Sequence, residues 1–285
     1  MDKQLSCLVL FFCLVLTACT SQPDTVPATA VTTSTLQVAI ATDDFVVGTP
    51  RIPFILFDGP QQVSTAQTVT LTAFDLSQDP PTPGWTGPAT GCNDYEVPYW
   101  VAYPEVPQAG VWGLAAAITL ADGTTTQAQF TIEVKEESPS PVVGDMALPS
   151  ENRTLATEPD ISKLSSGNAP NPAFYQMTVK EALNSKRPSV IVFSTPAFCQ
   201  TAICAPVLNS AETVYKSLSD EVNFIHLEVY KQFNPELILA DEMTEWQLAT
   251  EPWTYVLDDT GRVAARLGGP VSALELTAVL EPLLP

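Results

Sequence analysis

The pattern of apolar residues changes near the middle of the chain, and this change divides the 285 residues into two kinds of structure. From residue 36 to about residue 135, apolar and polar residues alternate in short runs without a helical period. Successive side chains of a strand point to opposite faces, so the alternation predicts half-buried strands. From residue 173 onward, helical and extended patterns follow one another instead. The chain is therefore expected to join an all-β region to an α/β region.

The all-β region, residues 36–135, is expected to be a sandwich, because short strands at regular spacing are typical of that architecture. Asp122 and Gly123 separate its last two apolar runs and predict a tight hairpin. The run 109–112 (AGVW) resembles the strand entry of small exported immunoglobulin-like domains. No constellation of catalytic residues is found in this region. Cys92 borders a stretch rich in Pro and Gly, 79–91, and is expected to be a free thiol on a loop.

Residues 1–19 have the layout of a secretory signal: Lys3 near the start, an apolar run over 5–16, and small residues after it. This run is too short to span a bilayer. The end of the segment, 16–19 (LTAC), resembles the lipobox of bacterial lipoproteins. That resemblance implies acylation of Cys19 and attachment to the outer face of the cell membrane, outside the cytoplasm. An ordinary signal peptide with an incidental cysteine is the alternative.

Two further segments are expected to connect these parts. Residues 20–35 are rich in Pro and Thr without apolar periodicity, which indicates a tether between membrane and folded chain. Residues 136–172 are rich in Pro, Ser and Asn and are expected to form a second linker, partly laid on the α/β region. The net charge of −20 excludes nucleic acid as an expected partner, because phosphate binding needs clustered Lys and Arg.

The α/β region is expected to span 173–285. Thr178 and Glu181 form a capping-box pattern, which predicts a short helix to Asn184. A continuous apolar run at 188–194 predicts a strand covered on both faces. The elements expected after it are a helix (201–218), a strand (222–230), a helix (235–248), a hairpin (253–258 and 261–267) and a final helix (272–280).

Cys199 and Cys204 are placed where the buried strand ends and the next helix begins. A helix N-terminus carries a partial positive charge and acidifies a nearby thiol. Residues five apart on a regular helix are roughly 8.6 Å apart at Cα, whereas a disulfide needs less than about 7 Å. We therefore expect Cys199 to lie in a turn ahead of the helix and, in an oxidising compartment, to pair with Cys204.

These cysteines after the apolar strand, together with Glu251–Pro252 before the hairpin, resemble the thioredoxin fold. The run 252–266 is similar to the exported, membrane-tethered TlpA-like thioredoxins, and the resemblance covers about 173–285. It implies a cis Pro252 that shapes a substrate groove, with Cys199 as attacking thiolate and Cys204 as resolving thiol. The implied activity is thiol–disulfide exchange with thiols or disulfides of exported proteins, without a cofactor. The sequence departs from the family in placing four residues between the cysteines and Phe198 before them.

Two polar residues are expected near this site. His226 is the single histidine, on a strand where thioredoxin-like proteins carry a polar residue beneath the disulfide, so the resemblance implies a proton relay to Cys204. A hydrogen-bonded histidine at the sheet margin is the alternative. Glu251 stands where relatives usually have an uncharged residue. If its carboxylate faces the cysteines, its charge disfavours the thiolate.

Other functions remain open from the sequence. Cys199, Cys204 and His226 could be three soft ligands for Cu(I), as in the copper chaperones of the Sco type, although the spacing differs. An inert structural disulfide is a second alternative. A two-cysteine peroxiredoxin shares the cysteine spacing, but its pattern requires Thr or Ser where this chain has Pro196. A Ser–His–acid hydrolase fits poorly, because no nucleophile elbow is present.

Overall fold

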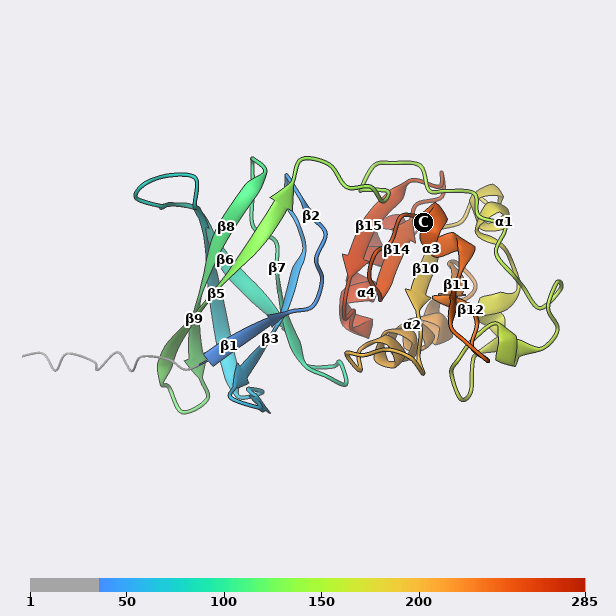
Figure 1. Ribbon diagram of the computed structural model, residues 1–285, viewed down its shortest axis with the longest axis horizontal. Coiled ribbons are helices and arrows are strands. Elements are labelled where there is room, and N and C mark those ends of the chain that lie inside the picture. The colour runs from blue at the N-terminus through green and yellow to red at the C-terminus, as the bar shows by residue number, and fades with distance from the viewer. Residues whose placement is uncertain (1–35, 285) are drawn as a thin grey trace, which may run out of the picture. The chain divides into compact units, whose positions relative to one another are not determined.

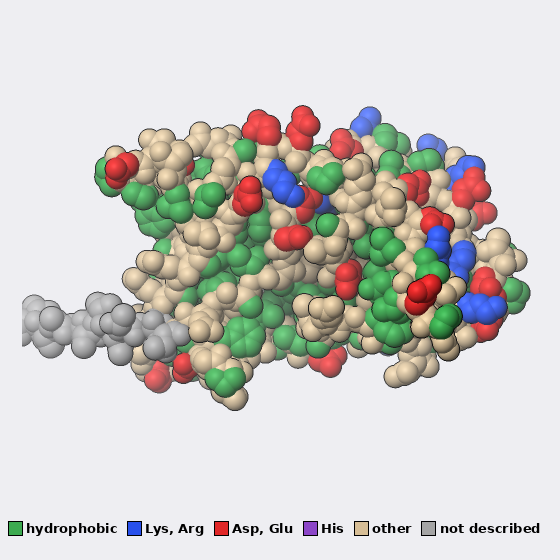
Figure 2. Space-filling view, viewed as in Figure 1, with side chains coloured by type: hydrophobic (Ala, Val, Ile, Leu, Met, Phe, Trp, Pro, Cys, Tyr) green, Lys and Arg blue, Asp and Glu red, His purple; other side chains and the backbone are tan. Residues whose placement is uncertain are grey.

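The computed structural model describes residues 36–284, which belong to one compact unit (Figure 1). The predicted signal segment, Cys19 and the tether lie outside the described residues. Within the described part, no helix is long and apolar enough to cross a membrane. Asp and Glu side chains are spread over the face seen in Figure 2, as the strongly negative net charge requires.

The N-terminal part of the described chain forms one nine-stranded sheet with the order β1-β3-β7-β6-β5-β8-β9-β2, and β4 pairs with β3 at one side. The pairs are antiparallel except for the parallel pair β2–β9. The strands are β1 (Leu36–Ile40), β2 (Phe45–Val46), β3 (Ile52–Asp58), β4 (Gln61–Gln62), β5 (Ala66–Asp75), β6 (Thr82–Cys92), β7 (Tyr99–Ala102), β8 (Gly110–Leu120) and β9 (Thr125–Lys135).

The predicted all-β character is present, but the immunoglobulin-like sandwich is not confirmed. Strand β6 pairs with β5 through residues 82–89 and with β7 through residues 90–92, so this strand links the two halves into one sheet. The sheet curls around its own apolar core, which includes Phe54, Leu71 and Trp112. The hairpin predicted at Asp122–Gly123 joins β8 to β9, and Gly123 supplies the positive φ of the turn.

The prediction that Cys92 is a loop thiol is wrong. The thiol is free, but Cys92 ends strand β6 and is 4% exposed. Most of the Gly and Pro residues that resemble a loop in the sequence belong to this strand; Pro80 and Pro81 precede it. A side chain at Gly84 would meet the ring of Trp112, and one at Gly87 would meet the ring of Trp85. These glycines therefore make room for the ring of Trp85 on the same strand and of Trp112 on β8.

The C-terminal part is a four-stranded sheet with the order β11-β10-β14-β15, in which β10 and β11 are parallel and β14 is antiparallel to both of its neighbours. This mixed sheet with helices confirms the α/β prediction. The elements are α1 (Val179–Asn184), β10 (Ser189–Ser194), α2 (Cys204–Leu218), β11 (Asn223–Glu228), β12 (Tyr230–Gln232), β13 (Ile238–Leu239), α3 (Asp241–Glu245), β14 (Trp253–Leu257), β15 (Val263–Gly268) and α4 (Ala273–Leu280).

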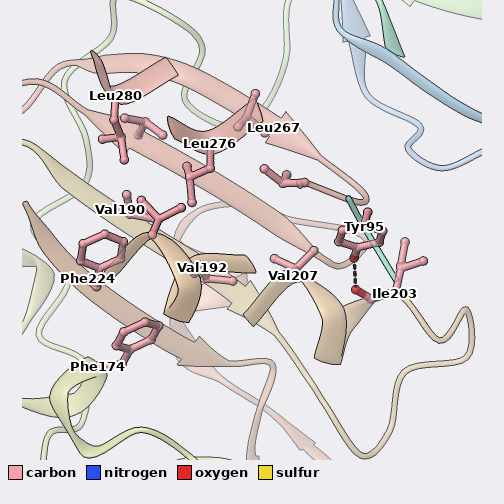
Figure 3. Packing of buried hydrophobic residues seen from close by; sticks show 14 of the residues in the cluster. Tyr95, Phe174, Val190, Val192, Ile203, Val207, Phe224, Leu267, Leu276 and Leu280 are labelled. Atoms are coloured by element: carbon pink, nitrogen blue, oxygen red, sulfur yellow. Dashed lines mark hydrogen bonds between the residues drawn. The ribbon is translucent and has the colours of Figure 1, made fainter. Parts of the chain in front are cut away.

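Two apolar layers cover the faces of this sheet. Val190 and Val192 of β10 face a core that α2 and α4 complete, as Figure 3 shows for Val207, Leu276 and Leu280. Ile191 and Phe193 face the opposite core, to which α1 and α3 contribute. Strand β10 is buried at every position, as the continuous apolar run predicts. The capping box of Thr178 and Glu181 at the start of α1 is also confirmed.

Two helix predictions need correction. Helix α2 begins at Cys204 rather than at residue 201, because Ala202 has a φ of 58°, outside the helical region. The helix predicted over 235–248 is reduced to α3. Its first part forms β13, in which Leu239 pairs with Tyr230 of β12, and the backbone N–H of Ala240 donates to the carbonyl of Val229. Strand pairing replaces a helix that local propensity favours.

Residues 136–172 are largely irregular and lie against the α/β part. The hydroxyl of Ser150 accepts from the indole N–H of Trp246, and the amide oxygen of Asn152 accepts from the backbone N–H of Val179.

The two sheets also share buried contacts. Arg51, immediately before β3, donates to both carboxylate oxygens of Glu275 in α4, at 2.6 and 2.8 Å. A second, largely buried ion pair joins Arg266 of β15 to Asp44 beside β2.

Candidate functional site

Cys199 and Cys204 form a disulfide with their Cα atoms 6.0 Å apart, as predicted. Cys199 lies in the loop between β10 and α2 and is partly exposed, whereas Cys204 is the first residue of α2 and is fully buried. The two sulfurs therefore differ in access to solvent. A partner thiol can reach Cys199 first.

The start of α2 favours negative charge at Cys204. The N-cap position is Ile203, which offers no side-chain hydrogen bond to the first turn. The first backbone N–H groups of a helix have no partner within it, and together with the helix dipole they stabilise an anion placed beside them. These N–H groups therefore act in favour of a thiolate at Cys204, against the effect of its burial.

The first sheet supports the cysteine loop from the side. The hydroxyl of Tyr95, which follows β6, donates to the carbonyl of Ile203 at 2.6 Å (Figure 3). Tyr95 and Ile203 belong to the same buried cluster, against which Cys199 packs. The residue immediately before the buried cysteine is thus fixed by a side chain 108 positions earlier in the sequence. No pattern in the sequence around Tyr95 indicates this contact.

The peptide bond Glu251–Pro252 is cis, as the resemblance implies, and it lies beside the disulfide. A carboxylate oxygen of Glu251 and the two cysteine sulfurs all lie within 4.8 Å of one another. The carbonyl of Pro252 accepts a hydrogen bond from the N–H of Gly269. The carboxylate of Glu251 therefore faces the cysteines, and any charge on it acts directly on them.

A second carboxylate affects Glu251. Burial and the charge of Glu228, in that order, raise the pKa of Glu251 above its ordinary value. Glu228 ends β11 and is 5% exposed. Its Oε2 accepts from the backbone N–H and the hydroxyl of Ser166, both at 2.8 Å, while its Oε1 has no hydrogen-bond partner among the described residues. No role for Glu228 is predicted from the sequence.

His226 is buried in β11 and bound to neighbours other than the cysteines. Its Nε2 lies 3.0 Å from the carbonyl of Ser194, and its Nδ1 lies 2.7 Å from the hydroxyl of Tyr175. A carbonyl can only accept, so Nε2 donates and Nδ1 accepts from Tyr175. Burial lowers the pKa of His226, although Glu228 and the bond to Ser194 act in the opposite direction. Burial thus favours the neutral ring, in which Ser194 and Tyr175 engage both nitrogens.

A groove of about 440 Å³ runs beside the cis-proline and the cysteine loop. Both sheets contribute apolar lining to it. The residues that define its two walls are Ile40, Ile55 and Phe57 from the first sheet, and Ile203, Glu251 and Pro252 from the α/β part.

No family model matches the sequence. No curated protein matches it. Among solved structures, the chain is similar to StoA from Bacillus subtilis, with 19% identity and a TM-score of 0.28, over 33% of this chain and 82% of that one. A thioredoxin family thiol:disulfide interchange protein from Chlorobium tepidum has 13% identity and a TM-score of 0.33, over 53% of this chain and all of its own. CopC from Methylosinus trichosporium has 14% identity and a TM-score of 0.26, over 36% and 98%.

Proposed function

We propose that the chain is a membrane-tethered, extracytoplasmic thiol–disulfide oxidoreductase that acts on exported proteins through a thioredoxin-like domain. The observation that carries the proposal is the disulfide between a partly exposed Cys199 and a buried Cys204 at the start of α2. The parallel pair β10–β11, the hairpin β14–β15 and the cis-proline beside the disulfide support the thioredoxin-like assignment.

The two cysteines have different roles in this reaction. In the reduced form, the thiolate of Cys199 attacks one sulfur of a substrate disulfide and releases the other as a thiolate, which leaves a mixed disulfide. The thiolate of Cys204 then attacks Cys199, frees the reduced substrate and re-forms the Cys199–Cys204 bond. When the protein starts with the Cys199–Cys204 disulfide and the substrate with two thiols, the same steps run in reverse and oxidise the substrate. The helix start lowers the cost of the buried Cys204 thiolate in either direction.

Replacing the resolving cysteine tests the proposal. Cys204→Ser, expressed in the native host, should accumulate mixed disulfides with exported proteins, because the sulfur that normally releases them is gone. Non-reducing gels should show adducts that dithiothreitol removes. Cys199→Ser should give few adducts, because Cys204 is buried. Absence of adducts from Cys204→Ser would leave an inert disulfide, whose loss affects only stability.

The lipid anchor is tested separately. Cys19→Ser should abolish labelling by a radioactive fatty acid and release the chain from the membrane, since only a thiol accepts the diacylglycerol. Cys92→Ser is the matched control, because this thiol is buried and free and has no part in the anchor. Label that persists on the Cys19→Ser chain would show that the proposed acylation site is wrong.

A further inference from the structure

The reduced form of the site offers a metal ion three convergent ligands. Among the described residues, Cys199, Cys204 and Glu251 are a group of potential metal ligands whose donor atoms all lie within 4.8 Å of one another. Ligands of a tetrahedral zinc ion, at about 2.0–2.3 Å from the metal, are themselves separated by roughly 3.5–3.8 Å. Once the S–S bond is broken, the two sulfurs and the carboxylate oxygen are therefore close enough to share one ion.

We propose that the reduced protein binds one Zn²⁺ through Cys199, Cys204 and Glu251, and that oxidation of the cysteines to the disulfide releases it. The inference uses the site of the proposed exchange activity, but it requires only that the disulfide can be reduced. A thiol reductant transfers two electrons and two protons to the disulfide and is itself oxidised to a disulfide. Zinc binding then releases the two thiol protons, and the two thiolates bind the ion.

The charges around the site favour a divalent cation in the reduced state. Two thiolates and the Glu251 carboxylate would bring three negative charges together, and Cys204 is fully buried. Like charges at this range destabilise one another strongly in a low dielectric. Glu228 adds to this repulsion, since its charge acts on Glu251. Its buried Oε1 has no hydrogen-bond partner among the described residues, so its charge is not offset at that atom. A bound Zn²⁺ offsets this repulsion, whereas the disulfide removes two of the charges.

The donor atoms distinguish zinc from copper. Cu(I) prefers thiolate, thioether and imidazole ligands, while Zn²⁺ also accepts a carboxylate. His226, the imidazole required by a copper site with these cysteines, has its nitrogens engaged by Ser194 and Tyr175. The third ligand that the fold places beside the sulfurs is the carboxylate of Glu251. Three protein ligands leave the fourth zinc position for water or an exchangeable ligand.

The experiment is a zinc titration of the purified full-length chain in detergent, reduced under argon and freed of reductant. Competition with a chromophoric zinc chelator should give one ion per reduced chain and none per oxidised chain. Glu251→Gln should weaken binding more than about tenfold, because even outer partners of metal ligands change affinity by that much. Glu221→Gln removes the same charge at an exposed position and should retain the wild-type affinity. X-ray absorption of the zinc complex should show two sulfur ligands.

Several results would overturn the inference. The site would be excluded if the reduced wild type bound zinc no more tightly than Cys199→Ser. It would also be excluded if Glu251→Gln had the same zinc affinity as the wild type. Tight Cu(I) binding that Glu251→Gln leaves intact, without zinc binding, would show a soft two-sulfur site instead. Because the titration contains no protein substrate and the trapping experiment can be run with a chelator, the two proposals fail separately. Circular dichroism of Glu251→Gln checks that the variant is folded.

Discussion

Arg51→Met should lower the free energy of unfolding by about 3–5 kcal/mol, because removing one partner of a buried ion pair leaves the other charge uncompensated. The side chains of Arg51 and Glu275 are 5% and 9% exposed. Arg51 also donates to the carbonyls of Gly268 and Pro270, so its loss leaves further acceptors without a partner. Chemical denaturation with the disulfide intact measures the change.

The pH dependence of the same variant identifies the cause. In the wild type, burial alone would raise the pKa of Glu275, but the charge and hydrogen bonds of Arg51 lower it overall. A lowered folded-state pKa contributes stability above the unfolded-state pKa, and this stability is lost as the pH falls through the folded-state pKa. In Arg51→Met burial dominates, so protonation of Glu275 favours the folded state. The difference between the two proteins should therefore shrink at acid pH.

Two comparisons sharpen this test. Adding Glu275→Gln to Arg51→Met should recover part of the lost stability, because it removes the unpaired charge. Lys180→Met breaks the exposed ion pair with Glu151 and should leave the denaturation midpoint almost unchanged. Equal effects of Arg51→Met and Lys180→Met would show that the pair between the two sheets does not contribute as its burial indicates.

Much of the α/β part can be predicted from the sequence, because its signals are local. The capping box at Thr178 and the apolar run of β10 each depend on a few consecutive residues. The position of Cys199 ahead of the helix follows from helix geometry and the length limit of a disulfide. The sequence-based predictions are wrong where a contact with a distant part of the chain outweighs the local helix propensity. The segment before α3 has helix-forming residues, yet part of it pairs with Tyr230.

The surroundings of the disulfide are less predictable for the same reason. Tyr95 donates to Ile203, which lies 108 residues later in the sequence. Glu228, at the end of β11, raises the pKa of Glu251, which lies before β14. Neither residue belongs to a pattern that a single sequence displays. His226 is conspicuous in the sequence as a single histidine, but the fold engages both of its nitrogens away from the sulfurs. Chemical type therefore identifies the cysteines but does not reveal that Tyr95 and Glu228 lie near them.

Glu251→Gln should make Cys199 of the reduced protein react with iodoacetamide on the order of tenfold faster near neutral pH. The thiolate is the reacting species, and a carboxylate within 4.8 Å disfavours it. At that distance, the repulsion between two unit charges is between about 1 and 3 kcal/mol for effective dielectric constants of 80 to 20. A tenfold change in rate corresponds to about 1.4 kcal/mol, which lies within this range. Alkylation rates measured against pH, with zinc removed by a chelator, give the comparison.

The pH window of this effect follows from the raised pKa of Glu251. Above that pKa the carboxylate is charged and slows the wild type relative to Glu251→Gln; as the pH falls through it, the carboxyl becomes neutral and the two rates should converge. Glu228→Gln removes one of the causes that raise the pKa of Glu251. The convergence should then move to lower pH in Glu228→Gln, because Glu251 stays charged further into the acid range. Identical alkylation rates for wild type and Glu251→Gln at every pH would show that the carboxylate of Glu251 does not disfavour the Cys199 thiolate. The charge argument for a cation in the reduced site would then fail as well.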